Sequence, residues 1–199
     1  MKQADLADRI DMFGRMTIAL EEIEACRECV SLMPEVRMNM VFAQPHAKNS
    51  DEVMAVDGRI TIINGILRGA GRVRFGASSH KARFIVELMK TDPSARAGID
   101  FGNPSGFSDR LSNYCIQQGW VFTMIDRRTE PAESRIAEGS SMQWKAAEAV
   151  RAGGGIVPKI ICDAGGIGKE PVCIFVGTEP IGVALDLREV ARAYVQSLK

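Results

Sequence analysis

Residues 73–85 read VRFGASSHKARFI, and this stretch predicts a short strand, a turn and the start of a helix. The apolar run at residues 73–75 ends at Gly76, and two serines follow. Apolar residues then recur at the spacing of one buried helical face: Ala82, Ile85, Leu88 and Met89. The first N–H groups of a helix have no intrahelical partner, and they suit a phosphate oxygen. We therefore expect an anion site in an α/β domain.

His80 is the leading functional candidate because it stands in the first turn of this helix. Its neighbours in the sequence are polar or basic: Ser78, Ser79, Lys81 and Arg83. A titratable imidazole beside an anion site is suited to catalysis. The alternative is plain helix capping by Ser78 or Ser79, with His80 as a surface residue.

The composition is that of one globular domain. The chain has 199 residues, 46% of them hydrophobic and 25% charged, and its net charge is zero. A zero net charge argues against binding to nucleic acid or to a membrane surface. No apolar run approaches the ~20 residues of a membrane span. The charged N-terminus has no apolar signal region, so we expect a cytoplasmic protein.

Five cysteines are scattered at positions 26, 29, 115, 162 and 173. The first two form a C-x-x-C pair, but no second pair follows, so we expect no metal bound by cysteines. The pair falls on an apolar stripe that predicts a helix over residues 16–33, ended by Pro34. We expect these cysteines to be buried as small apolar side chains.

Helices and strands are predicted to alternate along the rest of the chain. The expected strands are residues 38–43, 59–64, 73–75, 97–101, 120–125, 159–162 and 172–176, and the expected helices begin near residues 79, 108, 140 and 180. This alternation favours one α/β domain whose sheet is covered on both faces.

Two further polar loops lie next to predicted strands, as ligand loops of open α/β sheets do. Asp126-Arg127-Arg128 can bind phosphate oxygens through arginine, or it can be a solvated cluster of local ion pairs. The loop DAGGIGKEP at residues 163–171 fails as a Walker A motif because it lacks the first glycine and the Ser or Thr. Its glycines, with Asp163, Lys169 and Glu170, favour a ligand loop. Arg59, at a strand start, has an ordinary alternative as an edge residue.

Taken together, these segments resemble the thiamine-phosphate synthase of the ThiN type. The similarity runs from about Val30 to the C-terminus, in the segments MPEVRMNMVFA, DGRI, VRFGASSHKAR, IDRRTEP, EGSSMQW and DAGGIGKEP. The chain departs from that pattern at Arg37-Met38, where a small Gly-Ser pair is more common, and at Lys145, where Gly is usual. Both departures would alter the pocket wall.

The resemblance implies a three-layer α/β/α domain with a mixed sheet, like the class II aldolase and epimerase fold. Residues 1–33 would form a helical segment packed on the synthase domain of residues 34–199, giving one globular domain. The chain could be linked or fused to a hydroxymethylpyrimidine phosphate kinase, and a homodimer is compatible with the fold.

The implied reaction joins hydroxymethylpyrimidine diphosphate to hydroxyethylthiazole phosphate, giving thiamine phosphate and pyrophosphate. Arg59 and His80 match the family's catalytic Arg and His. The candidate substrate-binding residues are Asn39, Ser78, Ser79, Arg83, Asp126, Arg127, Arg128, Asp163, Gly168, Lys169 and Glu170. Mg²⁺ is expected with the substrate diphosphate, and either Asp126 or Asp163 would hold it through water or bind the pyrimidine amine. The alternative is a sensor that binds thiamine phosphate without catalysis. Sensors of this family tend to lack the His.

Overall fold

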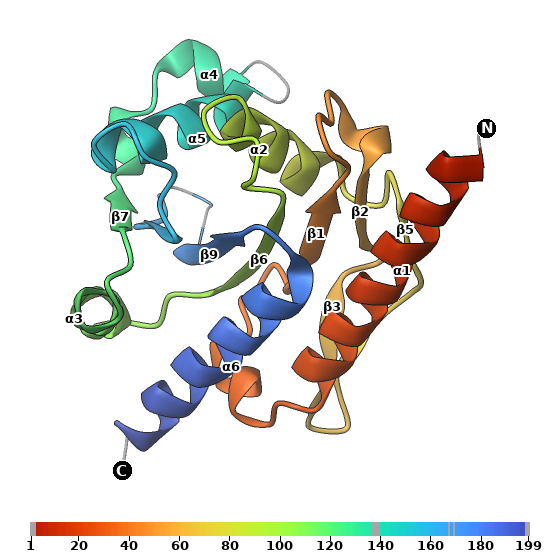
Figure 1. The fold of residues 1–199 in the computed structure, drawn as a ribbon. Helices are drawn as coiled ribbons and strands as arrows, with labels where there is room; N and C mark the ends of the chain where they lie inside the picture. Colours follow the sequence, from red (N-terminus) through yellow and green to blue (C-terminus); the bar gives the residue numbers. More distant parts are fainter. Residues whose placement is uncertain (1–2, 137–139, 167, 169, 198–199) are drawn as a thin grey trace.

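The structure is a computed structural model that describes residues 3–136, 140–166, 168 and 170–197. Its centre is a seven-stranded sheet in the order β5-β2-β1-β6-β9-β8-β7, next to a two-stranded hairpin, β3-β4 (Figure 1). Strands β7 and β8 are parallel, and every other neighbouring pair in the large sheet is antiparallel. The sheet is therefore mixed.

The strands are β1 (Met40–Ala43), β2 (Val53–Val56), β3 (Ile60–Ile63), β4 (Ile66–Gly69), β5 (Val73–Phe75), β6 (Ala97–Gly102), β7 (Phe122–Ile125), β8 (Ile160–Asp163) and β9 (Val172–Gly177). The α-helices are α1 (Gln3–Glu24), α2 (Ser79–Met89), α3 (Phe107–Gln118), α4 (Ala132–Ile136), α5 (Ser140–Ala152) and α6 (Pro180–Gln196). Three short 3-10 segments are η1 (Glu28–Leu32), η2 (Ser50–Glu52) and η3 (Arg127–Thr129).

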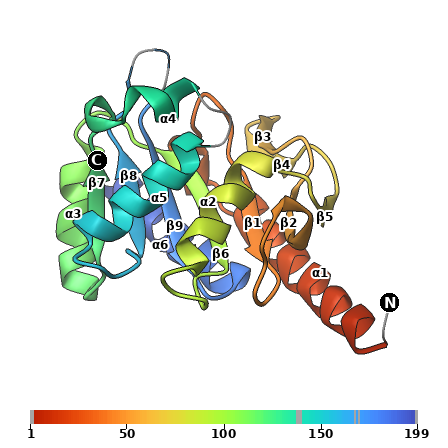
Figure 2. The same ribbon diagram turned by 90° about the horizontal axis from the view of Figure 1, so that it is seen from above.

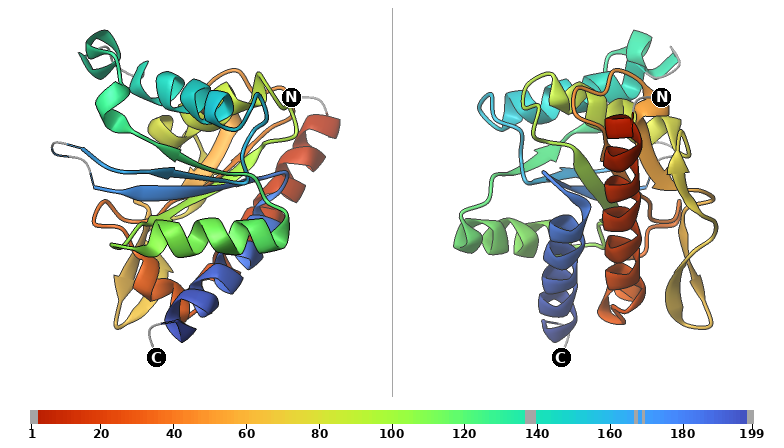
Figure 3. Two further views of the ribbon diagram at one scale, coloured as in Figure 1. Left: turned by 90° about the vertical axis from the view of Figure 1, so that its left-hand side faces the viewer. Right: turned by 45° about the vertical axis from the view of Figure 1, so that its right-hand side comes forward.

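Helices cover both faces of the sheet, which confirms the predicted three-layer α/β/α architecture. Helices α2, α4 and α5 lie on one side, and α1, α3 and α6 lie on the other (Figures 2 and 3). The buried side chains fall into two clusters accordingly, one on each side of the sheet. None of the helices in the described ranges combines the length and hydropathy of a membrane span.

Helix α2 forms as its sequence predicts. Its buried face holds Ala82, Ile85, Leu88 and Met89, and the ring of Phe84 is buried beside them. Gly76, with φ of 69°, makes the turn that separates β5 from the helix. A positive φ is readily adopted by glycine, so this residue sets the sharp entry into α2.

The prediction of one helix over residues 16–33 is wrong at both ends. Helix α1 begins at Gln3 and ends at Glu24, and the chain then turns into η1. The carboxylate of Glu24 accepts hydrogen bonds from Arg68 Nη1 at 2.6 Å and from the Gly69 N–H at 2.8 Å. These contacts connect the end of α1 to the β3-β4 hairpin. Apolar periodicity alone cannot predict such contacts, so it does not predict where the helix ends.

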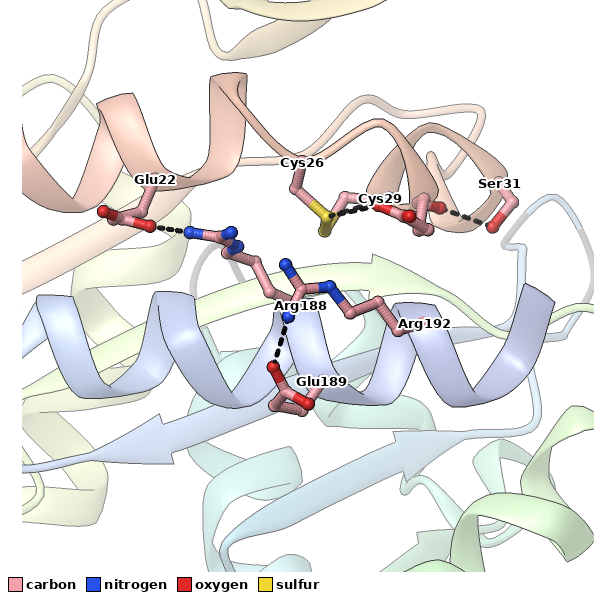
Figure 4. Close-up of a disulfide and its surroundings, with 8 residues drawn as sticks. Glu22, Cys26, Cys29, Ser31, Arg188, Glu189 and Arg192 are labelled. Carbon is pink, nitrogen blue, oxygen red and sulfur yellow. Dashed lines mark hydrogen bonds and ion pairs between the residues drawn. A yellow bond between two sulfur atoms is a disulfide. The ribbon is translucent and has the colours of Figure 1, made fainter. Parts of the chain in front are cut away.

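Cys26 and Cys29 are buried, as predicted, but they are paired in a disulfide that follows α1 (Figure 4). A second disulfide joins Cys162 of β8 to Cys173 of β9, and Cys115 is a buried free cysteine. Beside the first disulfide, Arg188 of α6 forms an ion pair with Glu22 of α1. The N-terminal helix is thus fixed against the last helix of the same fold.

Candidate active site

Two neighbouring chambers with shared lining residues open where the N-terminus of α2 meets the loops around the sheet. The inner chamber has a volume of about 420 Å³. It is lined by Val36, Arg37, Asn39, Arg59, Ser78, His80, Lys81, Asp100, Arg127, Ser141, Met142, Lys145, Asp163, Gly168, Glu170, Val172 and Ile174. The outer chamber, more open to solvent, has a volume of about 460 Å³ and adds Glu35, Gly58, Ala77 and Ser79. Both chambers share Arg59 and His80 as walls.

His80 lies at this shared wall, in the first turn of α2. The residue is exposed at the chambers, and the surrounding walls desolvate the imidazole in part. This desolvation, together with the cations Lys81, Lys145 and Arg127, lowers the pKa of His80 to about 4, and Asp100 opposes the shift. The imidazole of His80 is therefore neutral at neutral pH.

We expect the imidazole of His80 to titrate well below an ordinary histidine. An unfolded histidine has a pKa of about 6.5, so the unfolded chain binds more protons than the folded one between about pH 4 and 6.5. The free energy of unfolding should therefore rise with pH across that window, and His80→Ala should reduce the rise. The pKa of His80 is measured by NMR titration, and its signal is identified as the histidine signal that disappears in His80→Ala. A midpoint at or above 6.5 would contradict it. Inorganic pyrophosphate should raise the midpoint, because its charge offsets the cations.

Arg59 reaches the same wall from the turn before β3. Its backbone has a positive φ of 73°, directly after Gly58 with a φ of 68°. A non-glycine residue in this conformation costs on the order of 1–3 kcal/mol. Its guanidinium donates a hydrogen bond to the Val36 carbonyl, and the side chain remains exposed at the chambers. The fold thus tolerates a strained backbone at Arg59, and the side chain lines the chambers instead of lying at a sheet edge.

Ser78 occupies the N-cap position of α2, but its side chain makes no capping hydrogen bond. The hydroxyl instead lines both chambers, and Ser79 lines the outer one. The first N–H groups of α2 and its partial positive charge lie at the same place. This geometry favours the predicted anion site over the capping interpretation.

One wall of the inner chamber is a buried charge network around Asp163. The Asp163 Oδ2 atom lies 2.7 Å from Arg127 Nε and 3.0 Å from Lys145 Nζ, and Oδ1 accepts the Gly165 N–H at 2.7 Å. Arg127 also donates to Ser141 Oγ at 3.0 Å and to Glu130 Oε2 at 3.1 Å. Burial alone would raise the pKa of Asp163, but Lys145 and Arg127 outweigh it and lower the value. Asp163 is thus an ionised anchor for two cations.

A second buried pair lies under His80. Lys81 Nζ is 2.7 Å from Asp100 Oδ2, and Asp100 Oδ1 accepts the Asn39 N–H at 2.6 Å. The Asn39 side chain in turn bonds the backbone of Val56 and Met40. Asn39 lines both chambers, and its side-chain amide also connects β1 to β2 through the bonds to Val56.

Glu170 lines the inner chamber, but its carboxylate serves the backbone. It accepts the N–H groups of Glu35 at 2.7 Å and of Val36 at 2.5 Å. This contact fixes the loop whose carbonyl at Val36 binds Arg59. Gly168 also lines the chamber, and Lys169 lies outside the described residues.

The structure does not bring Asp126, Arg128 or Arg83 to the lining of either chamber. Asp126 caps η3 and pairs with Arg128, whose Nη2 lies 2.7 Å from Asp126 Oδ2, and this partner lowers the pKa of Asp126 to about 2. Only Arg127 of this triplet turns into the cavity. The local ion-pair interpretation thus describes two of its three residues.

Sequence reasoning assigned no role to several lining residues. These are Arg37, Lys81, Asp100, Ser141 and Lys145. A charged residue inside the apolar strand around Asp100 was a usable signal, since an aspartate is seldom buried without a partner. Lys145 was visible only as a departure from the family pattern.

The described side chains do not offer a magnesium site of their own. No group of three or more His, Cys, Asp or Glu residues within the described ranges could hold a metal ion. Asp163 and Asp100 are paired with cations, and Glu170 is bound by backbone N–H groups. Asp126, the other carboxylate considered for the metal, is paired with Arg128.

Comparisons with known proteins agree on one family. The family model "Thiamine-phosphate synthase ThiN" matches residues 15–189. The chain is 35% identical to thiamine-phosphate synthase ThiN of Methanothermobacter thermautotrophicus, over 91% of this chain and 92% of that protein. It is 32% identical to the bifunctional thiamine biosynthesis protein ThiDN of Methanocaldococcus jannaschii, over 82% of this chain and 37% of that protein.

Solved structures give the same result for the fold. A crystal structure of the C-terminal domain of phosphomethylpyrimidine kinase superposes with a TM-score of 0.84 and 28% identity, over 92% of this chain and 99% of that one. L-fuculose-1-phosphate aldolase from Thermus thermophilus shares the fold alone, with a TM-score of 0.50 and 14% identity over 92% of this chain and 95% of that one. The likeness to the aldolase fold is confirmed. By sequence and by structure, this chain belongs to the ThiN family of thiamine-phosphate synthases.

Proposed function

We propose that this protein is a transferase that joins hydroxymethylpyrimidine diphosphate to hydroxyethylthiazole phosphate. The observation that carries the proposal is the position of Arg59 and His80 on the wall shared by two chambers. A reaction of two phosphorylated substrates needs two neighbouring pockets with the departing group between them. Proximity of this kind supplies a large share of the catalytic effect.

In the proposed reaction, the C–O bond between the pyrimidinylmethyl carbon and the diphosphate breaks, and pyrophosphate leaves with the electron pair. The thiazole nitrogen donates its own electron pair to that carbon, which gives thiamine phosphate. Negative charge grows on the bridging oxygen, and fixed donors and cations stabilise it.

Arg59 supplies a permanent charge next to the outer chamber, and the N-terminus of α2 supplies backbone N–H groups. Because burial and neighbouring cations keep the pKa of His80 near 4, we propose that it acts first as a neutral hydrogen-bond donor to the diphosphate. Binding of the anion raises that pKa, so the imidazole can take up a proton as the charge develops.

Mg²⁺ enters this proposal with the diphosphate, as a complex formed in solution. The carboxylates that line the inner chamber are engaged with cations or backbone N–H groups, and Glu35 is the one carboxylate among the described residues that adds to the outer chamber, so no ligand set of the protein is invoked. The diphosphate itself must come from a phosphorylating reaction. The bifunctional relative and the structural neighbour, which is the C-terminal domain of phosphomethylpyrimidine kinase, support a functional link with such a kinase.

The test is product formation from both phosphorylated precursors and Mg²⁺, measured by chromatography. We expect thiamine phosphate and pyrophosphate in equal amounts. Absence of product at saturating substrates, with tight calorimetric binding of thiamine phosphate, would overturn the synthase and leave a sensor.

A further inference from the structure

Two lysines in the inner chamber carry more hydrogen-bond donors than the described residues accept. Lys145 is only 2% exposed, and its Nζ has one acceptor in the described part of the chain, Asp163 Oδ2 at 3.0 Å. Lys81 Nζ likewise has one, Asp100 Oδ2 at 2.7 Å. An ammonium group has three N–H donors, so each lysine has two left. Lys81 is half-buried, but Lys145 is fully buried, and buried donors rarely remain unpaired, which indicates a cavity shaped for an acceptor.

The charges of the inner chamber also favour an anion. Among the described residues, five cationic side chains line it against three carboxylates, and one of these, Glu170, is bound by backbone N–H groups. Asp163 is shared by Lys145 and Arg127, and Arg127 also pairs with Glu130 Oε2 at 3.1 Å. A ligand with negative charge would complete this balance.

The two lysines face the same space. Burial lowers the pKa of Lys145, Asp163 opposes the shift, and the nearby charge of Lys81 adds to it, so that the pKa is about 8. The Phe84 ring lies 5.9 Å from Lys145 Nζ, and the apolar side chains of Met142 and Ile174 line the same chamber. The chamber therefore suits an anion attached to an apolar ring.

We propose that Lys145 and Lys81 bind the phosphate of hydroxyethylthiazole phosphate, the phosphate that is retained in the product. This inference rests on the proposed function, which places the departing diphosphate at Arg59, His80 and the N-terminus of α2. The outer chamber is the more open of the two, so pyrophosphate can leave through it. The retained phosphate then occupies the inner chamber, and Lys145 is a substrate-binding residue.

The alternative is a buried ion pair with a purely structural role. Lys145→Met distinguishes phosphate binding from a structural role, because it nearly keeps the length of the side chain and removes its charge. Asp163 then still has Arg127 at 2.7 Å and the Gly165 N–H at 2.7 Å, so the fold has the contacts to survive. Lys145→Arg restores a cation at the same place. Lys90→Met is the matched control, since Lys90 is exposed and pairs with Glu87 away from both chambers.

The experiment measures the KM of each substrate separately, and the affinity for hydroxyethylthiazole phosphate by calorimetry. Losing a charge-assisted hydrogen bond costs a factor of about 10–100 in affinity. We expect Lys145→Met to raise the KM and Kd of the thiazole substrate by about that factor, and to leave the KM of the pyrimidine diphosphate within about twofold. Lys145→Arg should recover part of the loss, and Lys90→Met should match the wild type.

An unchanged KM and Kd for the thiazole substrate, or an equal rise for both substrates, would overturn the assignment while product formation upheld the synthase. A wild type that makes no product but binds the thiazole phosphate through Lys145 would uphold the site and reject the reaction. If Lys145→Met fails to fold, Lys81→Met provides the same comparison and the same two outcomes.

Discussion

Replacing His80 with alanine is expected to lower thiamine-phosphate formation about 10²–10⁴-fold, the range typical of a positioned acid–base group. His80 stands on the wall shared by both chambers, so it can reach a diphosphate leaving group. The imidazole is exposed at the cavity, and α2 is held by Phe84 and Ile85 on its opposite face. The variant should therefore keep its thermal unfolding temperature. The measurement is single-turnover product formation at saturating substrates.

A second substitution separates hydrogen bonding from proton transfer. His80→Gln keeps an N–H donor but cannot take up a proton, so partial recovery over alanine would assign the effect to hydrogen bonding. No recovery would assign it to the proton. His46→Asn is the control, because His46 is exposed, has a φ of 60° that asparagine tolerates, and lines neither chamber. Near-normal turnover by His80→Ala would remove His80 from the chemistry.

Much of the fold could be predicted because several elements carry local signals. The apolar face of α2 and the turn at Gly76 are visible in the sequence, and α5 begins at Ser140, where the sequence predicts a helix start. Other elements had signals that were not used. Asn64-Gly65, with φ values of 52° and 79°, is the two-residue turn that joins β3 to β4.

The end of α1 could not be predicted in this way. The apolar spacing reaches Ile23 and continues past Glu24 with Cys26, Val30 and Met33, so it predicts a longer helix. The helix ends where Glu24 meets the hairpin, and that contact joins residues far apart in the sequence. Propensity gives way to tertiary contacts here.

In the candidate site, too, residues with local sequence signals could be predicted and residues that depend on tertiary contacts could not. His80 and Ser78 could be found because a strand, a turn and a helix start are local features, and both residues line the chambers in the structure. The pairs Lys145–Asp163 and Lys81–Asp100 could not, because each joins different elements. The triplet at residues 126–128 shows the same limit. Segment η3 directs Arg127 toward Asp163, while Asp126 and Arg128 pair with each other away from the chambers, and the sequence does not distinguish the three.

Replacing Arg59 with glycine is expected to separate activity from stability. The guanidinium is the permanent charge proposed to stabilise the leaving diphosphate, and loss of one such donor costs about 10²–10³ in turnover. The same change removes the strain of a φ of 73°, a conformation that glycine adopts freely. Product formation should therefore fall about 10²–10³-fold. The thermal unfolding temperature should stay within a few degrees, since the relieved strain offsets the lost bond to Val36 and the added chain entropy.

Two further variants serve as controls for Arg59→Gly, one for the relief of backbone strain and one for the loss of charge. Asn64→Gly relieves a positive φ of 52° in the hairpin turn, away from both chambers, and should leave product formation unchanged. Arg59→Lys keeps the charge but loses the planar fork, so its turnover should fall between those of wild type and glycine variant. If Arg59→Gly makes product at the normal rate, the strained backbone serves only the loop at Val36. The charge at the shared wall would then have to come from Arg37, which lines both chambers and also has a positive φ, of 68°.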